Sequence, residues 1–186
     1  MGWQMKQVTI AGMTLQLLPE KAVYIESLEI LLVSDIHLGK SETFQSLGIP
    51  IANQINQVTI DRLHYLCTAL TPKMLIILGD LFHSNDGLVE EVVTQWTRFV
   101  DSISTTITVK LIVGNHDRQL IQSLHHLGVE WGTEALQIHQ LVLSHYPEPQ
   151  PRGLNICGHI HPCIRIKTRL DNLRLPCFFW IILLVY

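Results

Sequence analysis

At 186 residues the chain can bury a substantial core, and we predict a single domain over residues 1–186. A composition of 47% hydrophobic and 16% charged residues excludes a disordered chain, and a formal net charge of −3 excludes a general electrostatic attraction to nucleic acid. The four cysteines contain no C-x-x-C pair, which argues against a zinc ribbon. We therefore expect reduced, mostly buried thiols in a cytoplasmic protein with no membrane span.

The first half of the chain combines strand-type runs with helical patterns. Val8 to Leu18 is typical of an opening hairpin, and Leu28 to Ser34 is the predicted first core strand. We expect Lys40 to Asn56 to be a loop that is long enough to act as a flap. Helical spacing then predicts two helices, the first with Ile60, Leu63, Cys67 and Leu70 on one face and the second with Leu88, Val92, Trp96, Phe99 and Ile103.

The second half is richer in strands. Val109 to Val113 is a predicted strand that leads to a short helix ending at Gly128, and the residues from Ala135 onward are predicted to be mainly strands. The strand–helix–strand order favours parallel strands with right-handed crossovers, and the strand-rich end favours a second sheet. The apolar tail from Phe178 to Tyr186 is too short for a membrane helix, so we expect a buried terminal strand there.

Five apolar, strand-type runs end on residues that commonly bind metals. In an open α/β sheet, ligands bind beyond the carboxyl ends of the strands. We therefore predict one site at this edge that holds more than one metal ion. The residues that follow the five runs are Asp35 and His37; Asp80 and His83; Asn115, His116 and Asp117; His145; and His159 and His161.

Each of these motifs has an ordinary structural explanation when it is taken alone. Asp35 and His37 lie on the same side of an extended segment, but such a pair also occurs in surface loops. Asp80 follows four apolar residues, where a carboxylate needs a cation or donors, although it could also cap a helix. Their conjunction on successive strands favours the metal site.

The types of ligand limit which metals fit. Carboxylate and amide oxygens combined with imidazole nitrogens suit Mn²⁺, Fe or Zn²⁺ better than Ca²⁺. We expect two divalent transition-metal ions, with Mn²⁺ as the first choice and Fe or Zn as alternatives. Asp80 is central in the chain order and is the candidate carboxylate to bridge the two ions.

Four motifs together resemble the calcineurin-like metallophosphoesterases in order and spacing: Asp35-x-His37, Gly79-Asp80-x-x-His83, Gly114-Asn115-His116-Asp117 and Gly158-His159-x-His161. The resemblance implies a four-layer αββα sandwich, an α/β fold of two mixed sheets flanked by helices. It also implies that one ion is held by Asp35, His37, Asp80 and His161, and the other by Asp80, Asn115, His145 and His159. His116 would be the catalytic histidine, oriented by Asp117.

A narrower resemblance extends over nearly the whole chain. The segments Leu18 to Ala22, Asp35 to Lys40, Gly48 to Pro50, Gly79 to Ser84, Gly158 to Pro162 and Leu175 to Phe178 are similar to the bacterial ligase-associated DNA damage response endonucleases. This similarity implies a DNA endonuclease of DNA repair, linked to a repair helicase and a ligase, in which a metal-bridging hydroxide attacks phosphorus in line. Related chains continue into a further strand and a Gly-rich tail, whereas here the sequence runs into Ile181 to Tyr186, so we expect a terminal strand that is altered or truncated.

Several basic or imidazole side chains are candidates to contact the substrate. Lys40 and Arg118 directly follow metal-binding motifs and are candidate contacts to the scissile phosphate. His83 is a candidate substrate contact near the site or a group that supports the ligands, and we do not expect it to be a ligand itself. Five basic residues also gather after His145, and they could contact phosphates or simply face solvent: Arg152, Arg165, Lys167, Arg169 and Arg174.

Two alternatives to a nuclease stay open. One is a phosphomonoesterase or a small-molecule phosphodiesterase with the same dinuclear centre, because the loops select the substrate. The other is a non-catalytic scaffold, which the presence of His116 disfavours.

Overall fold

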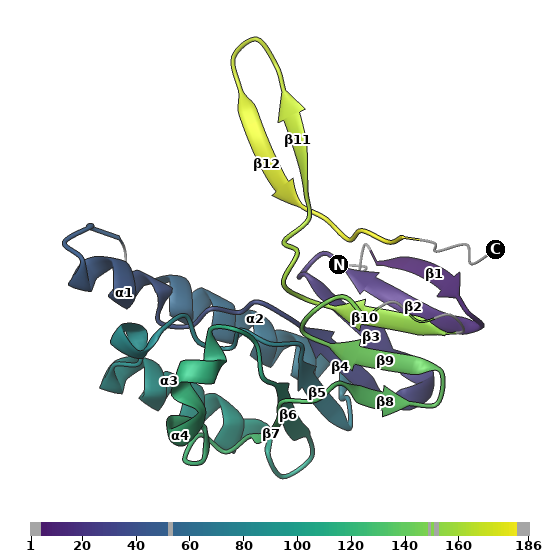
Figure 1. Ribbon diagram of the computed structural model, residues 1–186, viewed down its shortest axis with the longest axis horizontal. Coiled ribbons are helices and arrows are strands. Elements are labelled where there is room, and N and C mark those ends of the chain that lie inside the picture. Colours follow the sequence, from purple (N-terminus) through teal and green to yellow (C-terminus); the bar gives the residue numbers. More distant parts are fainter. Residues whose placement is uncertain (1–4, 52–53, 149, 151–152, 182–186) are drawn as a thin grey trace.

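A large mixed sheet forms the centre of the computed structural model, which describes residues 5–51, 54–148, 150 and 153–181 (Figure 1). Its strand order is β1-β2-β3-β4-β5-β6-β7, antiparallel from β1 to β4 and parallel from β4 to β7. The strands are β1 (Lys6–Ile10), β2 (Met13–Leu18), β3 (Ala22–Ile25), β4 (Ile30–Val33), β5 (Met74–Ile77), β6 (Thr108–Ile112) and β7 (Glu130–Gly132).

A second, smaller sheet packs against the large one, and a separate hairpin follows it. The small sheet has the order β10-β9-β8, in which β9 and β10 are parallel. Its strands are β8 (Leu136–Ile138), β9 (Leu141–Ser144) and β10 (Leu154–Cys157), and the hairpin consists of β11 (Cys163–Lys167) and β12 (Asn172–Pro176). The α/β fold with two sheets and flanking helices is therefore confirmed.

Helices connect the parallel strands of the large sheet. The α-helices are α1 (Lys40–Ser46), α2 (Gln54–Leu70), α3 (Glu90–Ile103) and α4 (Ile121–Leu124), and short 3-10 turns are η1 (Glu26–Leu28), η2 (Asn85–Gly87) and η3 (Asp117–Leu120). The two long helices predicted from the sequence are α2 and α3, and the opening hairpin is β1–β2. No helix of the described residues is long and apolar enough to cross a bilayer.

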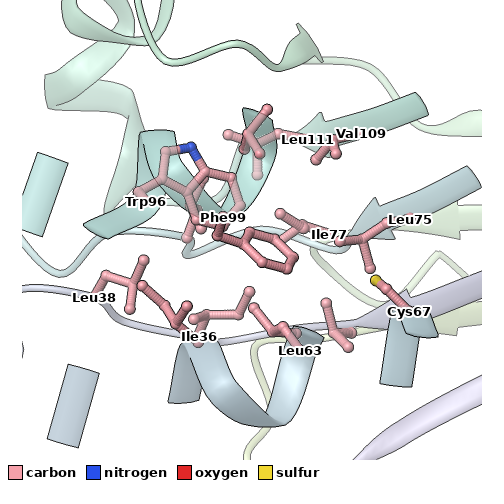
Figure 2. Close-up of a cluster of buried hydrophobic side chains, with 14 of the residues drawn as sticks. Ile36, Leu38, Leu63, Cys67, Leu75, Ile77, Trp96, Phe99, Val109 and Leu111 are labelled. Carbon is pink, nitrogen blue, oxygen red and sulfur yellow. The ribbon is translucent and has the colours of Figure 1, made fainter. Parts of the chain in front are cut away.

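Alternation along the strands divides the core into two clusters. On β5, Leu75 and Ile77 join the helix-facing cluster, which includes Leu63 and Trp96, whereas Ile76 joins the cluster between the sheets. Figure 2 shows the first cluster around Leu63 and Trp96. The second cluster includes Leu141 and Leu143 of β9. These contacts fix the two sheets relative to each other.

Two expectations about loops and termini were wrong. Half of the expected flap is helical, because Lys40 to Ser46 contains no helix breaker before Gly48, where α1 has ended. The described part of the expected terminal strand, Phe178 to Ile181, forms no strand and is exposed, because it pairs with no other strand of the described residues. Phe178, Phe179 and Trp180 line an apolar cavity of about 600 Å³ beside β1, β2 and β10. Residues 182–186 lie outside the described residues.

The four cysteines are reduced, as expected, but most of them are not buried as expected. All four are free thiols, but only Cys67 is buried, since Cys157 and Cys177 are partly exposed and Cys163 is exposed. Burial raises the pKa of Cys67 to about 12, so this thiol stays protonated and behaves as a core residue.

Candidate metal centre

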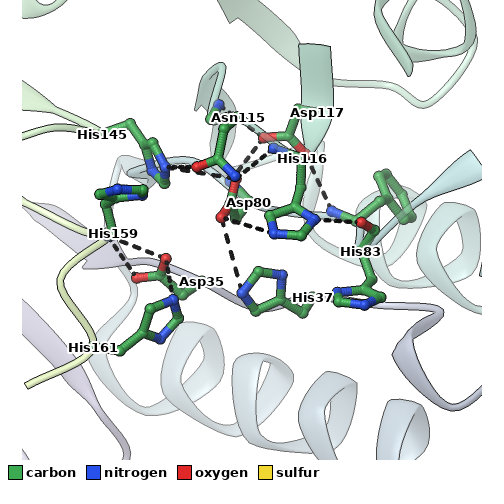
Figure 3. Close-up of polar contacts among 12 residues, drawn as sticks. Asp35, His37, Asp80, His83, Asn115, His116, Asp117, His145, His159 and His161 are labelled. Carbon is green, nitrogen blue, oxygen red and sulfur yellow. Dashed lines mark hydrogen bonds and ion pairs between the residues drawn. The ribbon is translucent and has the colours of Figure 1, made fainter. Parts of the chain in front are cut away.

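The carboxyl ends of β4, β5, β6, β9 and β10 bring the predicted site residues together (Figure 3). Three of these strands belong to the large sheet and two to the small one. The register aligns Val33 of β4 with Ile77 of β5, and Ile77 with Leu111 of β6, so the loops that follow begin at the same edge. The convergence expected from the sequence is therefore present.

Asp80 is the central residue of the site. Its side chain is buried, and Oδ1 accepts a hydrogen bond from the backbone N–H of His116 at 3.0 Å. Oδ1 also lies 3.6 Å from Nε2 of His145, while Oδ2 lies 3.9 Å from Nε2 of His37 and 4.0 Å from Nε2 of His116. The two oxygens thus face two different groups of imidazoles.

The first group of donors consists of Asp35, His37 and His161, whose ligand atoms lie within 4.8 Å of one another. Nε2 of His161 lies 3.4 Å from Oδ1 of Asp35, and the rings of His37 and His161 are stacked with centroids 5.6 Å apart. The backbone N–H of His159 donates to Asp35 at 3.1 Å, which fixes the β10 loop against the β4 loop.

The second group consists of Asp80, His145 and His159, again within 4.8 Å, with Asn115 beside them. Nδ1 of His145 lies 2.9 Å from the carbonyl oxygen of Leu78. A carbonyl can only accept, so Nδ1 carries a proton and Nε2 is the ring atom that is directed at the site. Nε2 lies 2.9 Å from Oδ1 of Asn115 and 3.6 Å from Oδ1 of Asp80, so three potential metal-ligand atoms meet at this point.

This convergence of potential metal ligands fits a cation. Metal–ligand bonds of about 2.0–2.2 Å place neighbouring ligands of one ion roughly 3–3.5 Å apart. The separations between Asp35 and His161 (3.4 Å) and between Asp80 and His145 (3.6 Å) are close to that range. Burial also lowers the pKa of His37 to about 4, against the opposing effect of Asp80, which keeps this ring neutral and able to bind a metal near neutral pH.

The backbone of these loops is held in an unusual conformation. Five of the predicted metal ligands have a positive φ, which costs a non-glycine residue about 1 kcal/mol: Asp35 (52°), His37 (51°), Asp80 (55°), His159 (66°) and His161 (47°). Hydrogen bonds between the β4 and β5 loops offset this cost. The N–H of Asp35 donates to the Gly79 carbonyl at 3.0 Å, and that of His37 to the Asp80 carbonyl at 2.9 Å.

Two glycines permit the close approach of these loops. A Cβ on Gly114 would lie 2.2 Å from Oδ1 of Asp80, and a Cβ on Gly79 would lie 2.1 Å from Nδ1 of His145. Gly79 also has a φ of 84°, which a side chain disfavours. The glycines before Asp80 and Asn115 are therefore required by packing within the site.

Asp117 has a different contact from the one expected. Its carboxylate is fully buried and accepts hydrogen bonds from three backbone N–H groups, those of Asp80 (2.7 Å), Gly114 (3.0 Å) and Phe82 (3.2 Å). Burial raises its pKa, and the three donors oppose part of that increase. The Asp117 oxygens are directed at these amides and not at the His116 ring, so any orienting effect of Asp117 on His116 would act through the loop backbone.

The His116 ring is instead held by the backbone of His83. Nδ1 of His116 lies 2.6 Å from the His83 carbonyl oxygen and therefore donates to it, so Nε2 faces the site. The His83 and His116 rings are stacked with centroids 4.9 Å apart. Burial lowers the pKa of His83, and the nearby His116 and Lys40 lower it further, whereas Asp80 opposes this decrease.

The other side chains near the site differ in their exposure. Arg118 is exposed on η3, directly after Asp117. Sequence analysis missed Tyr146, whose ring lies 4.8 Å from that of His145 and 4.5 Å from that of His159. Its position next to His145 in the chain was the only signal available.

Comparisons with known proteins agree with this geometry. The family model of the calcineurin-like phosphoesterases matches residues 28–178. The crystal structure of the Pseudomonas putida nuclease MPE is 29% identical in sequence and superimposes with a TM-score of 0.79, covering 94% of this chain and 81% of that one. No curated protein sequence matches significantly.

The family match includes all five loops of the site, from Asp35 to His161. Members of this family use divalent metal ions, for which the clusters of histidine and aspartate provide ligands. This chain therefore belongs to the calcineurin-like phosphoesterase family and is a metal-dependent phosphoesterase.

Proposed function

We propose that this enzyme is a two-metal phosphodiesterase that cleaves DNA and acts in DNA repair. The observation that carries the proposal is the position of Asp80, whose two carboxylate oxygens face two adjacent groups of donors. A carboxylate in that position can serve two ions at once, which is the arrangement that two-metal hydrolysis of phosphoesters requires.

The proposed ligands follow the two groups. Asp35, His37, Asp80 and His161 would hold one ion, and Asp80, Asn115, His145 and His159 the other. Mn²⁺ is the first choice, and Fe or Zn²⁺ would also suit this mixture of oxygen and nitrogen ligands. When bound, two such ions polarise a phosphoester and lower the pKa of water.

The remaining residues would act on the substrate. His116 keeps its Nδ1 proton on the His83 carbonyl, so Nε2 is the atom that would donate a proton to the leaving oxygen or stabilise charge on a phosphoryl oxygen. Asp117 would position the loops of Asp80 and Gly114 through its three hydrogen bonds. Lys40, His83 and Arg118 would contact the phosphate or its neighbours.

A nucleic-acid substrate is supported by the likeness to the P. putida nuclease. Phosphomonoesters and small phosphodiesters are the alternative substrates, since the same centre can hydrolyse them. The association with a repair helicase and a ligase, the location in the cytoplasm and the single-domain organisation stay predictions.

The test is metal-dependent cleavage of supercoiled and linear DNA, with Asp80→Ala as the control. We expect cleavage with Mn²⁺, none with chelator, and none by Asp80→Ala, which should also lose both metals. Hydrolysis of bis(p-nitrophenyl) phosphate well above that of p-nitrophenyl phosphate would support a phosphodiesterase. The reverse preference, without DNA cleavage, would contradict the nuclease and favour the phosphomonoesterase.

A further inference from the structure

The β11–β12 hairpin projects from the body of the protein (Figure 1). Every residue of both strands is exposed, whereas the strands of the large and small sheets bury at least one face or pack partly. Two isolated strands are marginally stable in water and gain from a partner. The hairpin is therefore a candidate binding surface.

The pairing of the strands separates the hairpin into two faces. Arg165 pairs with Arg174 and Lys167 with Asn172, so the three basic side chains lie on one face. The opposite face is apolar and consists of Ile164, Leu175, Ile166 and Leu173. Arg169 lies beyond the end of β11, and Arg152 lies outside the described residues.

The charge of the hairpin is opposite in sign to that of the rest of the chain. Residues 163–176 contain four basic residues and one acidic residue, a net charge of +3, which leaves −6 for the other residues because the whole chain carries −3. Positive charge that is concentrated on one projecting element indicates a local site for a polyanion.

The basic face also lacks its own counter-charge. Arg165 and Arg174 are directly opposed, and like charges in that arrangement are destabilising. Among the described residues neither guanidinium forms an ion pair. Nε of Arg165 donates to Oδ1 of Asn172 at 2.9 Å, and Arg174 contacts the thiol of Cys163 at 3.2 Å. An anion bound between the two guanidinium groups would remove the repulsion.

The base of the hairpin adjoins the candidate metal centre. β11 begins two residues after His161, and the N–H of Cys177 donates to the Pro162 carbonyl at 3.1 Å, which closes the base. Five residues per strand extend roughly 17 Å from that point. An anionic chain with a phosphate in the centre could reach the basic face with its neighbouring phosphates.

We propose that the β11–β12 hairpin is a nucleic-acid-binding arm, in which Arg165, Lys167 and Arg174 contact the phosphate backbone beside the cleaved bond. This inference rests on the proposed nuclease function, and it assigns the contact to the basic face. Regularly spaced phosphates are the ligand that matches a row of exposed cationic side chains.

The test measures DNA binding without cleavage, by fluorescence anisotropy with single-stranded and duplex oligonucleotides in chelator over a series of salt concentrations. The test variant is Arg165→Gln/Lys167→Gln/Arg174→Gln. The control is Lys73→Gln/Arg98→Gln/Lys110→Gln, which removes the same charge from elsewhere on the molecule. A second comparison, Ile166→Thr/Leu173→Thr, alters the apolar face of the same hairpin without changing its charge.

We expect the basic-face variant to bind DNA at least about tenfold more weakly, with a slope of log K against log salt that is smaller by about 2–3, as three lost phosphate contacts predict. Both control variants should keep the wild-type slope. Hydrolysis of bis(p-nitrophenyl) phosphate should be unchanged in all of them, which also verifies folding. The single variant Lys167→Gln, with a slope smaller by about 0.7–0.9, repeats the test with a milder change.

Three outcomes would overturn the proposal that the hairpin binds nucleic acid. They are a basic-face variant that binds like its charge-matched control, a loss of binding confined to the apolar-face variant, or a wild type that binds no DNA. DNA binding through the basic face without DNA cleavage would contradict the nuclease while leaving the arm in place.

Discussion

Asp117→Asn is the sharpest test of how this centre is assembled. The substitution keeps the shape of a fully buried side chain but replaces one accepting oxygen by an NH₂ group. Oδ2 accepts from Asp80 and Gly114, and Oδ1 from Phe82. The least costly orientation puts the amide oxygen at Oδ2, so the Phe82 N–H is left facing another donor. One buried, unpaired donor costs about 1–3 kcal/mol of unfolding free energy.

Asp117→Ala leaves all three donors without the carboxylate and should cost at least about 3 kcal/mol. The measurement is urea unfolding of the metal-free protein, with the free energy obtained from the midpoint and slope. Asp101→Asn, at an exposed position of α3, is the control and should change stability by less than about 0.5 kcal/mol. If both Asp117 variants match this control, the hydrogen bonds of Asp117 do not hold the loops together and our reasoning fails.

Three further predictions concern the same site. Gly114→Ala should lower metal affinity and activity at least tenfold, because its Cβ would lie 2.2 Å from Oδ1 of Asp80. The control Gly132→Ala, whose Cβ has no atom within 4 Å, should keep both properties. Equal metal-binding titrations of the two variants would refute this reasoning. His116→Ala should bind metal normally yet turn over an unactivated diester poorly, and a full rate would remove its assigned role. The free energy of unfolding of the metal-free protein should decrease as the pH falls from 6.5 to about 4. The reason is that His37 has a pKa of 6.5 in the unfolded chain and about 4 in the folded protein, so in this range only the unfolded chain gains the proton. The full pKa shift of His37 corresponds to roughly 3 kcal/mol of unfolding free energy, of which we expect about half after solvent screening. His37→Gln should therefore flatten the dependence of the urea midpoint on pH.

The sequence predicted the site better than it predicted the periphery. Asp35, Asp80 and His159 could be placed together because each follows an apolar, strand-type run, and the carboxyl ends of parallel strands share one edge. The same rule applied to both sheets, since β9 and β10 are parallel to each other like β4 to β6. The roles of these residues in metal binding and catalysis stay predictions.

Features that depend on tertiary contacts could not be read from the chain. The motif places Asp117 next to His116, but only the fold shows that its carboxylate is directed at the amides of a different loop. The tail from Phe178 looked like a strand because its residues are apolar, yet pattern alone does not provide an edge with which to pair. Tyr146 became visible only when β9 and β10 placed it against His159.

The division of the donors between two sheets has a mechanical consequence. Asp35 and His37 extend from the large sheet and His161 from the small one, and the second group likewise joins Asp80 to His145 and His159. Loading with metal would therefore tie the two halves of the molecule together, and every increase in ion concentration above the dissociation constant would raise the melting temperature. Conversely, loosening the apolar layer between Ile76 and Leu143 would spread the ligands apart without touching one of them.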